Sequence, residues 1–192
     1  MASFVRTMTL VGILFLPAAV NAAMWEFTGF MDDDQALTSM VPDSYFGGGF
    51  VSALLDTGTG EFNWFVSFGG LTTEETNAHF HLAPPGSSGG VVQTLTDESV
   101  RTGTSTTGSY VGSATLDAAK IASLTTNSLT GLEEHIVGDV TDWYANIHTG
   151  DSPDGEIRGQ LGVSAISAVP LPAAIWLFLP AVVMLARVRR RP

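Results

Sequence analysis

The amino-acid sequence predicts an all-β fold: an antiparallel β-sandwich of the immunoglobulin-like or Greek-key type, with one short helix and a C-terminal transmembrane helix. Short segments in which apolar and polar residues alternate recur along residues 23–165, and glycine-rich turns separate them. Many short strands at close spacing, with little helical periodicity, are typical of two packed antiparallel layers. The transmembrane helix is predicted from an uncharged apolar run close to the C-terminus.

The N-terminal 22 residues have the pattern of a secretion signal. Arg6 precedes an apolar stretch over residues 8–20, and Val20 and Ala22 are small residues at the positions that a signal peptidase reads. We therefore expect residues 1–22 to be removed. The alternative is an uncleaved anchor, although the apolar stretch is short for a stable membrane span.

The strand candidates carry their apolar residues on one face. Trp25 and Phe27 alternate with Glu26 and Thr28, and a later segment does the same with the side chains of Phe62, Trp64, Val66 and Phe68. Residues 56–60, Asp-Thr-Gly-Thr-Gly, are rich in types that tolerate a positive φ and predict a hairpin turn. Residues 116–124 have near-helical apolar spacing and predict the short helix.

The region between the two terminal signals is strongly acidic and has no cysteine. It contains all 19 acidic residues but only three basic ones (Arg101, Lys120 and Arg158), so its net charge is −16. Such a surface repels nucleic acid and anionic lipid, and it attracts divalent cations or basic partners. Without disulfides, the exported domain must be stabilised by packing.

Three histidines are the candidates for chemistry. His79 and His81 are two residues apart on a predicted strand and so share a face, while Ala78 and Phe80 point into the core. His148 lies on a second predicted strand. If the two strands are neighbours, the three imidazoles can form a zinc or copper site, which requires nitrogens converging within about 4 Å. His135, beside two glutamates, is a weaker fourth ligand.

The alternative for these histidines is an ordinary polar surface that fixes a loop by hydrogen bonding. Other candidate sites are weaker still. The run Asp32, Asp33 and Asp34 lacks the alternating ligands of a calcium loop and is interpreted as solvated. No nucleophile elbow or phosphate-binding loop is found, so the sequence predicts a protein that is not an enzyme.

A turn and two flanking strands are predicted late in the domain. Pro153 suits an early turn position and Gly155 suits the left-handed one, in a turn between strands at residues 142–149 and 156–163. On the second strand Glu156, Arg158 and Gln160 share one face. We expect Arg158 to form an exposed sheet-face ion pair with Glu156, worth under about 1 kcal/mol.

The C-terminus combines a proline box, an apolar run over residues 169–186 and a cluster of arginines. The box is Val169, Pro170, Leu171, Pro172 and Ala173, and the cluster is Arg187, Arg189, Arg190 and Arg191. An apolar run of nearly 20 residues approaches the length that spans a bilayer, and positive flanks remain on the cytoplasmic side. The alternative is a buried core helix, but it does not explain the four arginines or the proline box.

This tail resembles the PEP-CTERM sorting signals, in the variant whose box reads Val-Pro-Leu-Pro-Ala. The resemblance implies an exosortase-type membrane protease as a partner, a Gram-negative host with an exopolysaccharide system, and a membrane helix that is transient. The protein would then pass through an inner-membrane-anchored intermediate to the cell surface or the exterior.

The domain itself resembles the chordin-type (CHRD) family. One motif is Asn77-Ala78-His79-Phe80-His81, and the other is Trp143-Tyr144-Ala145-Asn146-Ile147-His148-Thr149 followed by Gly155-Glu156-Ile157-Arg158-Gly159-Gln160-Leu161. Leu82 and Ala83 replace the Gly-Pro that the family carries after its histidine pair. The predicted organisation is a signal peptide (1–22), a CHRD β-sandwich (23–165) and a sorting and transmembrane tail (166–192).

Two functions from different classes follow. The first is a non-catalytic exported protein, delivered to the cell surface or exopolysaccharide matrix, with an adhesive or structural role. The alternative is a periplasmic or surface copper- or zinc-binding protein, related to redox chemistry, that uses His79, His81 and His148. Its His-x-His sandwich is loosely similar to copper-zinc superoxide dismutase, but the chain has too few histidines for a bridged two-metal site.

Overall fold

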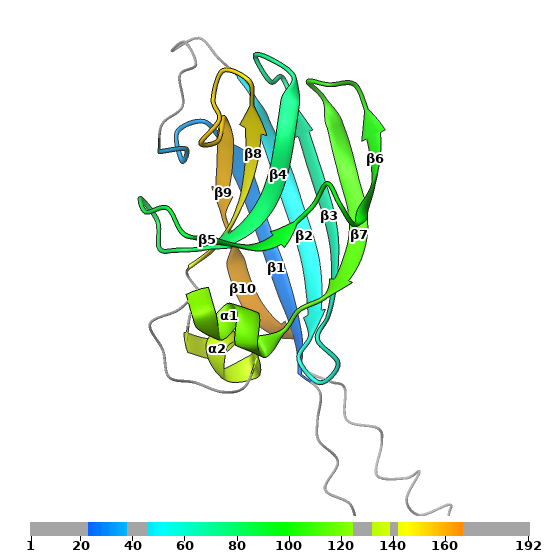
Figure 1. Ribbon diagram of the computed structural model, residues 1–192, viewed down its shortest axis with the longest axis vertical. Coiled ribbons are helices and arrows are strands. Elements are labelled where there is room, and N and C mark those ends of the chain that lie inside the picture. The colour runs from blue at the N-terminus through cyan, green and yellow to red at the C-terminus, as the bar shows by residue number, and fades with distance from the viewer. Residues whose placement is uncertain (1–22, 38–45, 125–131, 139–141, 167–192) are drawn as a thin grey trace, which may run out of the picture.

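The computed structural model describes residues 23–37, 46–124, 132–138 and 142–166. Within these ranges the chain is almost entirely antiparallel β-structure with two short helices (Figure 1). The strands are β1 (Met24–Asp32), β2 (Gly48–Asp56), β3 (Glu61–Gly69), β4 (Glu75–Leu82), β5 (Gly90–Thr94), β6 (Ser99–Gly103), β7 (Gly108–Thr115), β8 (Trp143–Thr149), β9 (Ile157–Gln160) and β10 (Gly162–Ile166). The helices are α1 (Ala118–Leu124) and α2 (Leu132–Gly138).

All the strands belong to one curled sheet. Its order is β5-β4-β8-β9-β1-β2-β3-β7-β6, and β10 pairs with β1 beside this path. The sheet curls so that β4, β5 and β8 lie in front of β1, β2 and β3, and the core fills the space between the two halves (Figure 1). The all-β antiparallel prediction is confirmed, but the expected pair of separate sheets is replaced by one continuous sheet.

Strand β1 explains the continuity, because it is hydrogen-bonded to both halves. Its first residues pair with β10, and Asp32 at its end pairs with Arg158 of β9. The single strand expected over residues 156–163 is instead broken at Leu161, whose N–H bonds to the Trp143 carbonyl and whose side chain is buried. This break sends β9 and β10 to different parts of β1.

The core follows the predicted alternation. Phe62, Trp64, Val66 and Phe68 of β3 are all buried, as are Trp25 and Phe27 of β1. Phe62 lies at the centre of an aromatic cluster, with ring centroids 5.1 to 6.2 Å from those of Phe27, Trp64, Phe80 and Trp143. The contacts of Phe62 with Phe27 and Phe80 are edge-to-face, and contacts of this kind add to the stabilisation from apolar burial.

The turn between β2 and β3 is also as predicted. The Asp56 carboxylate accepts hydrogen bonds from the N–H groups of Gly58 and Thr59, and Gly60 closes the turn with a φ of 76°. A Cβ atom at Gly60 would lie 2.7 Å from the Leu116 carbonyl oxygen, so both the backbone conformation and the space favour glycine here.

The predicted helix at residues 116–124 is present as α1, and a second helix, α2, was not predicted. The helices contact one another at one end of the curled sheet (Figure 1). α2 has only seven residues, and only Leu132 and Ile136 supply its apolar face, with His135 buried beside them. Two apolar residues four apart are too weak a signal to predict a helix from sequence.

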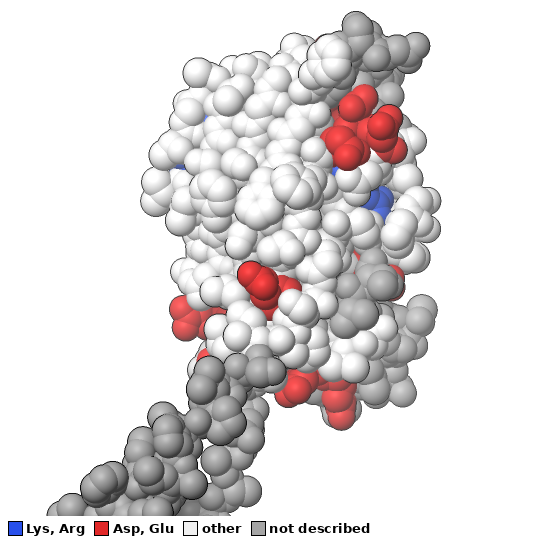
Figure 2. All heavy atoms as spheres, turned by 180° about the vertical axis from the view of Figure 1, so that it is seen from behind, with Lys and Arg blue, Asp and Glu red and all other residues white. Residues whose placement is uncertain are grey.

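Charged groups are sparse on the face formed by β1, β2 and β3. Seen from behind, this face is largely uncharged, with a few separate acidic groups (Figure 2). Among the described residues, no helix has the length and apolar character needed to cross a bilayer. The predicted transmembrane run at residues 169–186 lies outside the described residues.

Candidate metal centre

The pairing of β4 with β8 brings the three histidines together. In this antiparallel ladder His79 faces Asn146, His81 faces Tyr144, and Asn77 faces His148. The histidines therefore occupy adjacent positions on one sheet face, opposite the buried Ala78 and Phe80. Strand β4 is an interior strand, since β5 pairs along its other edge, so the His-x-His segment does not lie on an open edge.

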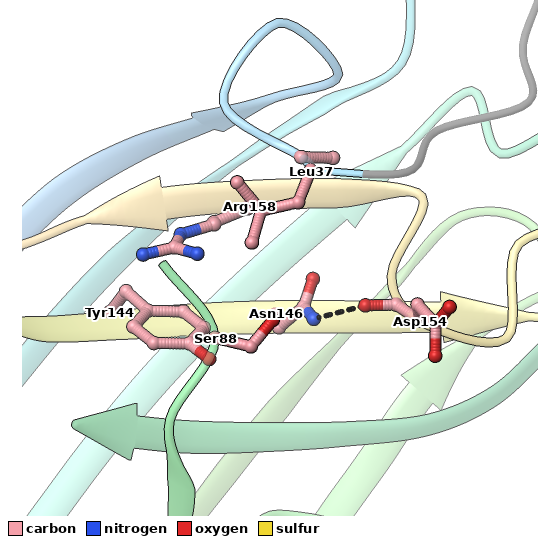
Figure 3. Close-up of a pocket in the computed structure, with 7 residues that line it drawn as sticks. Leu37, Ser88, Tyr144, Asn146, Asp154 and Arg158 are labelled. Atoms are coloured by element: carbon pink, nitrogen blue, oxygen red, sulfur yellow. Dashed lines mark hydrogen bonds between the residues drawn. The ribbon is translucent and has the colours of Figure 1, made fainter. Parts of the chain in front are cut away.

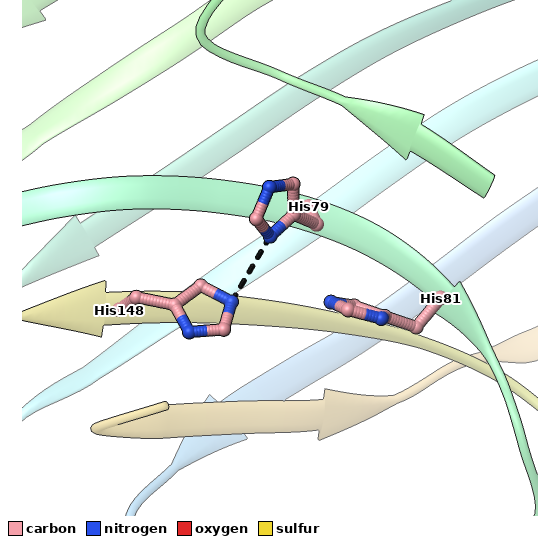
Figure 4. Close-up of side chains that lie close together, drawn as sticks. All are labelled: His79, His81 and His148. Carbon is pink, nitrogen blue, oxygen red and sulfur yellow. Dashed lines mark hydrogen bonds between the residues drawn. The ribbon is translucent and has the colours of Figure 1, made fainter. Parts of the chain in front are cut away.

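The three imidazole rings point toward a common centre (Figure 4). One ring nitrogen from each residue lies within 4.8 Å of the other two, and the closest contact, from His79 Nδ1 to His148 Nε2, is 3.0 Å. In a tetrahedral site, zinc–nitrogen bonds of about 2.0–2.1 Å place the ligand nitrogens roughly 3.3 Å apart. The limit of 4.8 Å is wider than the roughly 4 Å expected from the sequence, so metal binding would have to draw the three nitrogens closer together.

Backbone carbonyls fix the orientation of two of the rings. His81 Nδ1 donates to the Gly89 carbonyl at 3.1 Å, and His148 Nδ1 donates to the Pro153 carbonyl at 2.8 Å. Because a carbonyl can only accept, each of these neutral rings carries its proton on Nδ1 and a lone pair on Nε2. His79 Nδ1 consequently donates to His148 Nε2. The His81 Nε2 atom is buried and has no partner among the described residues.

The three histidines favour the uncharged form. Burial, together with the neighbouring His148 and His81, lowers the pKa of His79 to about 4. Burial also lowers the pKa of His81 to about 4, against the opposing effect of the Gly89 carbonyl. The pKa of His148 is lowered mainly by burial. Neutral imidazoles are the form that binds metal ions, so the cluster presents lone pairs at neutral pH.

Tyr144 and Arg158 form a stack beside the cluster. The His81 ring lies parallel to the Tyr144 ring, with an interplanar angle of 5° and centroids 4.8 Å apart. The Arg158 guanidinium carbon lies 3.6 Å from the centroid of the same tyrosine ring. Gly89 joins the stack to the loop after β4, since its N–H donates to the Tyr144 hydroxyl while its carbonyl accepts from His81.

The expected surface ion pair between Glu156 and Arg158 was wrong. Both residues are buried, at 0% and 3% exposure. The guanidinium donates to the carbonyls of Ser87 and Pro84 and to Gln160 Oε1. The Glu156 carboxylate instead accepts from the Thr72 N–H and from the hydroxyls of Thr72 and Thr149. Alternation along a strand shows that Glu156 and Arg158 share a face, but it does not show whether that face is exposed to solvent. Here loops cover the face.

The turn after β8 holds two side chains of the site by hydrogen bonds to its backbone carbonyls. Asn146 donates to the Asp154 carbonyl at 2.9 Å, next to the Pro153 carbonyl that holds His148. Gly155 has a φ of 122°, and a side chain there would collide with the Asn146 amide. The predicted turn is confirmed, and two successive carbonyls in it accept from the two side chains: Pro153 from His148, and Asp154 from Asn146.

The remaining predicted site residues do not join the cluster. His135 is fully buried in α2 and is not part of the three-histidine group. Asp32 ends β1, and its carboxylate accepts from the Gln35 backbone and side chain. The predicted cleavage positions Val20 and Ala22, the box at residues 169–173 and the arginines Arg187, Arg189, Arg190 and Arg191 lie outside the described residues.

Sequence reasoning missed Gly89, Tyr144 and Arg158 as neighbours of the histidines. A signal for Tyr144 was present, because it shares the parity of His148 on β8. The position of Arg158 depends on the register of the β8–β9 hairpin, which pairs it with Asn146. No local pattern marks Gly89, whose role follows from a long-range contact between loops.

Comparison with known protein families identifies the domain. The family model for the CHRD domain matches residues 30–161, which is more than half of the chain. The chain belongs to the CHRD domain family. The match covers the region from the end of β1 to the break after β9, so all three histidines, Tyr144 and Arg158 lie inside the CHRD domain. No curated protein and no solved structure matches the chain.

Proposed function

We propose that this CHRD domain binds one zinc or copper ion through His79, His81 and His148. The observation that carries the proposal is the convergence of three imidazole nitrogens within 4.8 Å. Imidazole is a preferred ligand of both metals, and three protein ligands leave a fourth position for water or another small ligand.

The surroundings of the cluster support the same function. Metal-bound histidines usually donate their second ring N–H to a carbonyl or carboxylate, which fixes the ring and its tautomer. The Gly89 and Pro153 carbonyls make these contacts with His81 and His148. The ligand atoms would be Nε2 of His81 and His148 together with Nδ1 of His79, after transfer of its proton to Nε2.

Metal analysis of the purified protein tests this function. After incubation with zinc or copper and removal of the excess, we expect about one ion per chain. The double variant His79→Gln, His81→Gln should lose it, because one imidazole cannot hold the ion. His135→Gln, which removes the histidine outside the cluster, serves as the matched control and should retain the metal. A parent protein that binds no metal would exclude the proposal.

We also propose, from the two ends of the chain, that the domain is exported and sorted by an exosortase-type protease to the cell surface or exopolysaccharide matrix. There it would have an adhesive or structural role. The apolar N-terminus, the box at residues 169–173 and the arginine cluster support delivery. The net charge of −16 between them supports solubility outside the cell.

Cell fractionation tests the sorting. Removing residues 169–192 should shift the protein from the surface fraction to the periplasm or the medium. The double variant Pro170→Ala, Pro172→Ala keeps the apolar run and the arginines, so it should accumulate as an uncut, membrane-bound form. Unchanged localisation of the truncated protein would contradict the sorting claim.

A further inference from the structure

A cavity adjoins the histidine cluster on the side of Tyr144 and Arg158. It has a volume of about 230 Å³ and is lined by Leu37, Ser88, Tyr144, Asn146, Asp154 and Arg158, together with Ala36 (Figure 3). A second cavity of about 170 Å³ shares Ala36, Leu37 and Arg158 with the first. Both are smaller than the roughly 300–1,000 Å³ of pockets for drug-sized ligands. The space therefore suits a ligand of about the size of a monosaccharide.

Arg158 supplies the cavity with a positive charge that has spare donors. A guanidinium has five N–H groups, and three hydrogen bonds from Arg158 end on neutral oxygens of Ser87, Pro84 and Gln160. No carboxylate of the described residues forms an ion pair with it. A buried cation with neutral partners is costly to desolvate, and a carboxylate that accepts the remaining N–H groups would offset that cost.

Asn146, the residue of β8 that pairs with Arg158 of β9, supplies an unpaired acceptor to the cavity. Its side chain is 6% exposed, and its Nδ2 group donates to the Asp154 carbonyl. Its Oδ1 atom is buried and has no partner among the described residues, and in Figure 3 it points toward the side of the cavity where Arg158 lies. An unpaired buried acceptor is unfavourable, so this atom fits a ligand that donates an O–H group.

From these observations we infer that the cavity binds a small hydroxy-carboxylate, with the carboxylate on Arg158 and a hydroxyl group on Asn146 Oδ1. The Asp154 side chain and the Ser88 hydroxyl, which also line the cavity, provide further partners for hydroxyl groups. The ligand occupies a place beside the histidine cluster rather than within it, so the inference does not depend on bound metal.

Titration calorimetry of the purified protein with D-glucuronate, and with D-glucose as the neutral counterpart, tests the inference. Glucuronate should bind at least about tenfold more tightly than glucose, because only glucuronate has a carboxylate that can accept from an unused N–H group of Arg158. Arg158→Gln should abolish the preference. Arg101→Gln, which removes the β6 arginine that forms an ion pair with Glu75 of β4, should preserve the preference.

Because Arg158→Gln could also disturb folding, a second variant outside the hydrogen-bond network tests the cavity independently. Leu37 is 45% exposed at the margin of both cavities, so Leu37→Trp should fill the space, leave the fold intact and abolish glucuronate binding. Equal affinity for glucuronate and glucose, absence of glucuronate binding, or glucuronate binding that survives Leu37→Trp would each overturn the inference and leave a water-filled cavity.

Discussion

Gly89 connects two side chains that define the histidine site. Its carbonyl accepts from His81 and its N–H donates to Tyr144, and any side chain at this position would collide with the Leu82 carbonyl. The segment from Leu82 to Gly89 can therefore cross the end of β4 closely only if residue 89 is glycine. One backbone position sets the orientation of one imidazole.

We predict that Gly89→Ala lowers zinc affinity by about 10-fold or more, because loss of a carbonyl partner to a ligand histidine typically costs 10- to 100-fold. Competition with a fluorescent zinc chelator measures the affinity. Gly150→Ala is the control, since a side chain there meets nothing closer than the Thr73 hydroxyl at 3.9 Å. Equal affinity of the Gly89→Ala variant and the parent would show that Gly89 does not orient His81.

At the scale of the secondary-structure elements, β3 forms the centre of the core. Its inward side chains alternate with exposed ones, and Phe62 contacts four other aromatic rings. The outward Phe65 on the same strand is 42% exposed. The same residue type in the same strand thus occupies two different environments.

We predict that Phe62→Ala lowers the free energy of unfolding by about 3–5 kcal/mol, from lost burial and the cavity left behind. Phe65→Ala should change it by no more than about 1 kcal/mol, as expected for an exposed position. Urea denaturation of the two variants measures both values. Similar losses in the two variants would mean that β3 is not half-buried in the way described.

The sequence predicted elements whose signal is local, and it failed where partners are distant. The alternation in β1 and β3, the turn at residues 56–60 and α1 were predicted correctly because each depends on neighbouring residues. The break at Leu161 and the covered face of Arg158 depend on strands and loops that approach from elsewhere in the chain. The histidines illustrate the same limit. Alternation along each strand predicted the face on which each histidine lies, but their closeness to one another depends on the pairing of β4 with β8.

At the scale of the whole molecule, the lowered pKa values of the histidines make stability depend on pH. In the unfolded chain a histidine has a pKa of about 6.5, whereas those of His79 and His81 are about 4 in the folded protein. Between these values the unfolded chain binds protons that the folded chain does not. Folding is therefore progressively disfavoured as the pH falls through this window, and it is unaffected by these groups above about pH 7.

We predict that the metal-free protein loses stability between pH 7 and pH 5, by up to about 1.4 kcal/mol per pH unit for each histidine that resists protonation. Partial exposure of His79 reduces its share. Urea denaturation across this range, with a chelator present, measures the slope. The triple variant with glutamine at positions 79, 81 and 148 should show a flatter dependence, and an unchanged slope in that variant would assign the effect to other groups.

The central claim is that His79, His81 and His148 together bind one metal ion. A crystal structure of the zinc-loaded protein tests it most directly. The account predicts zinc about 2.0–2.1 Å from Nδ1 of His79 and from Nε2 of His81 and His148, with the Gly89 and Pro153 carbonyls still accepting from the two Nδ1–H groups. Zinc bound only at surface carboxylates, with the three imidazoles unligated, would contradict it.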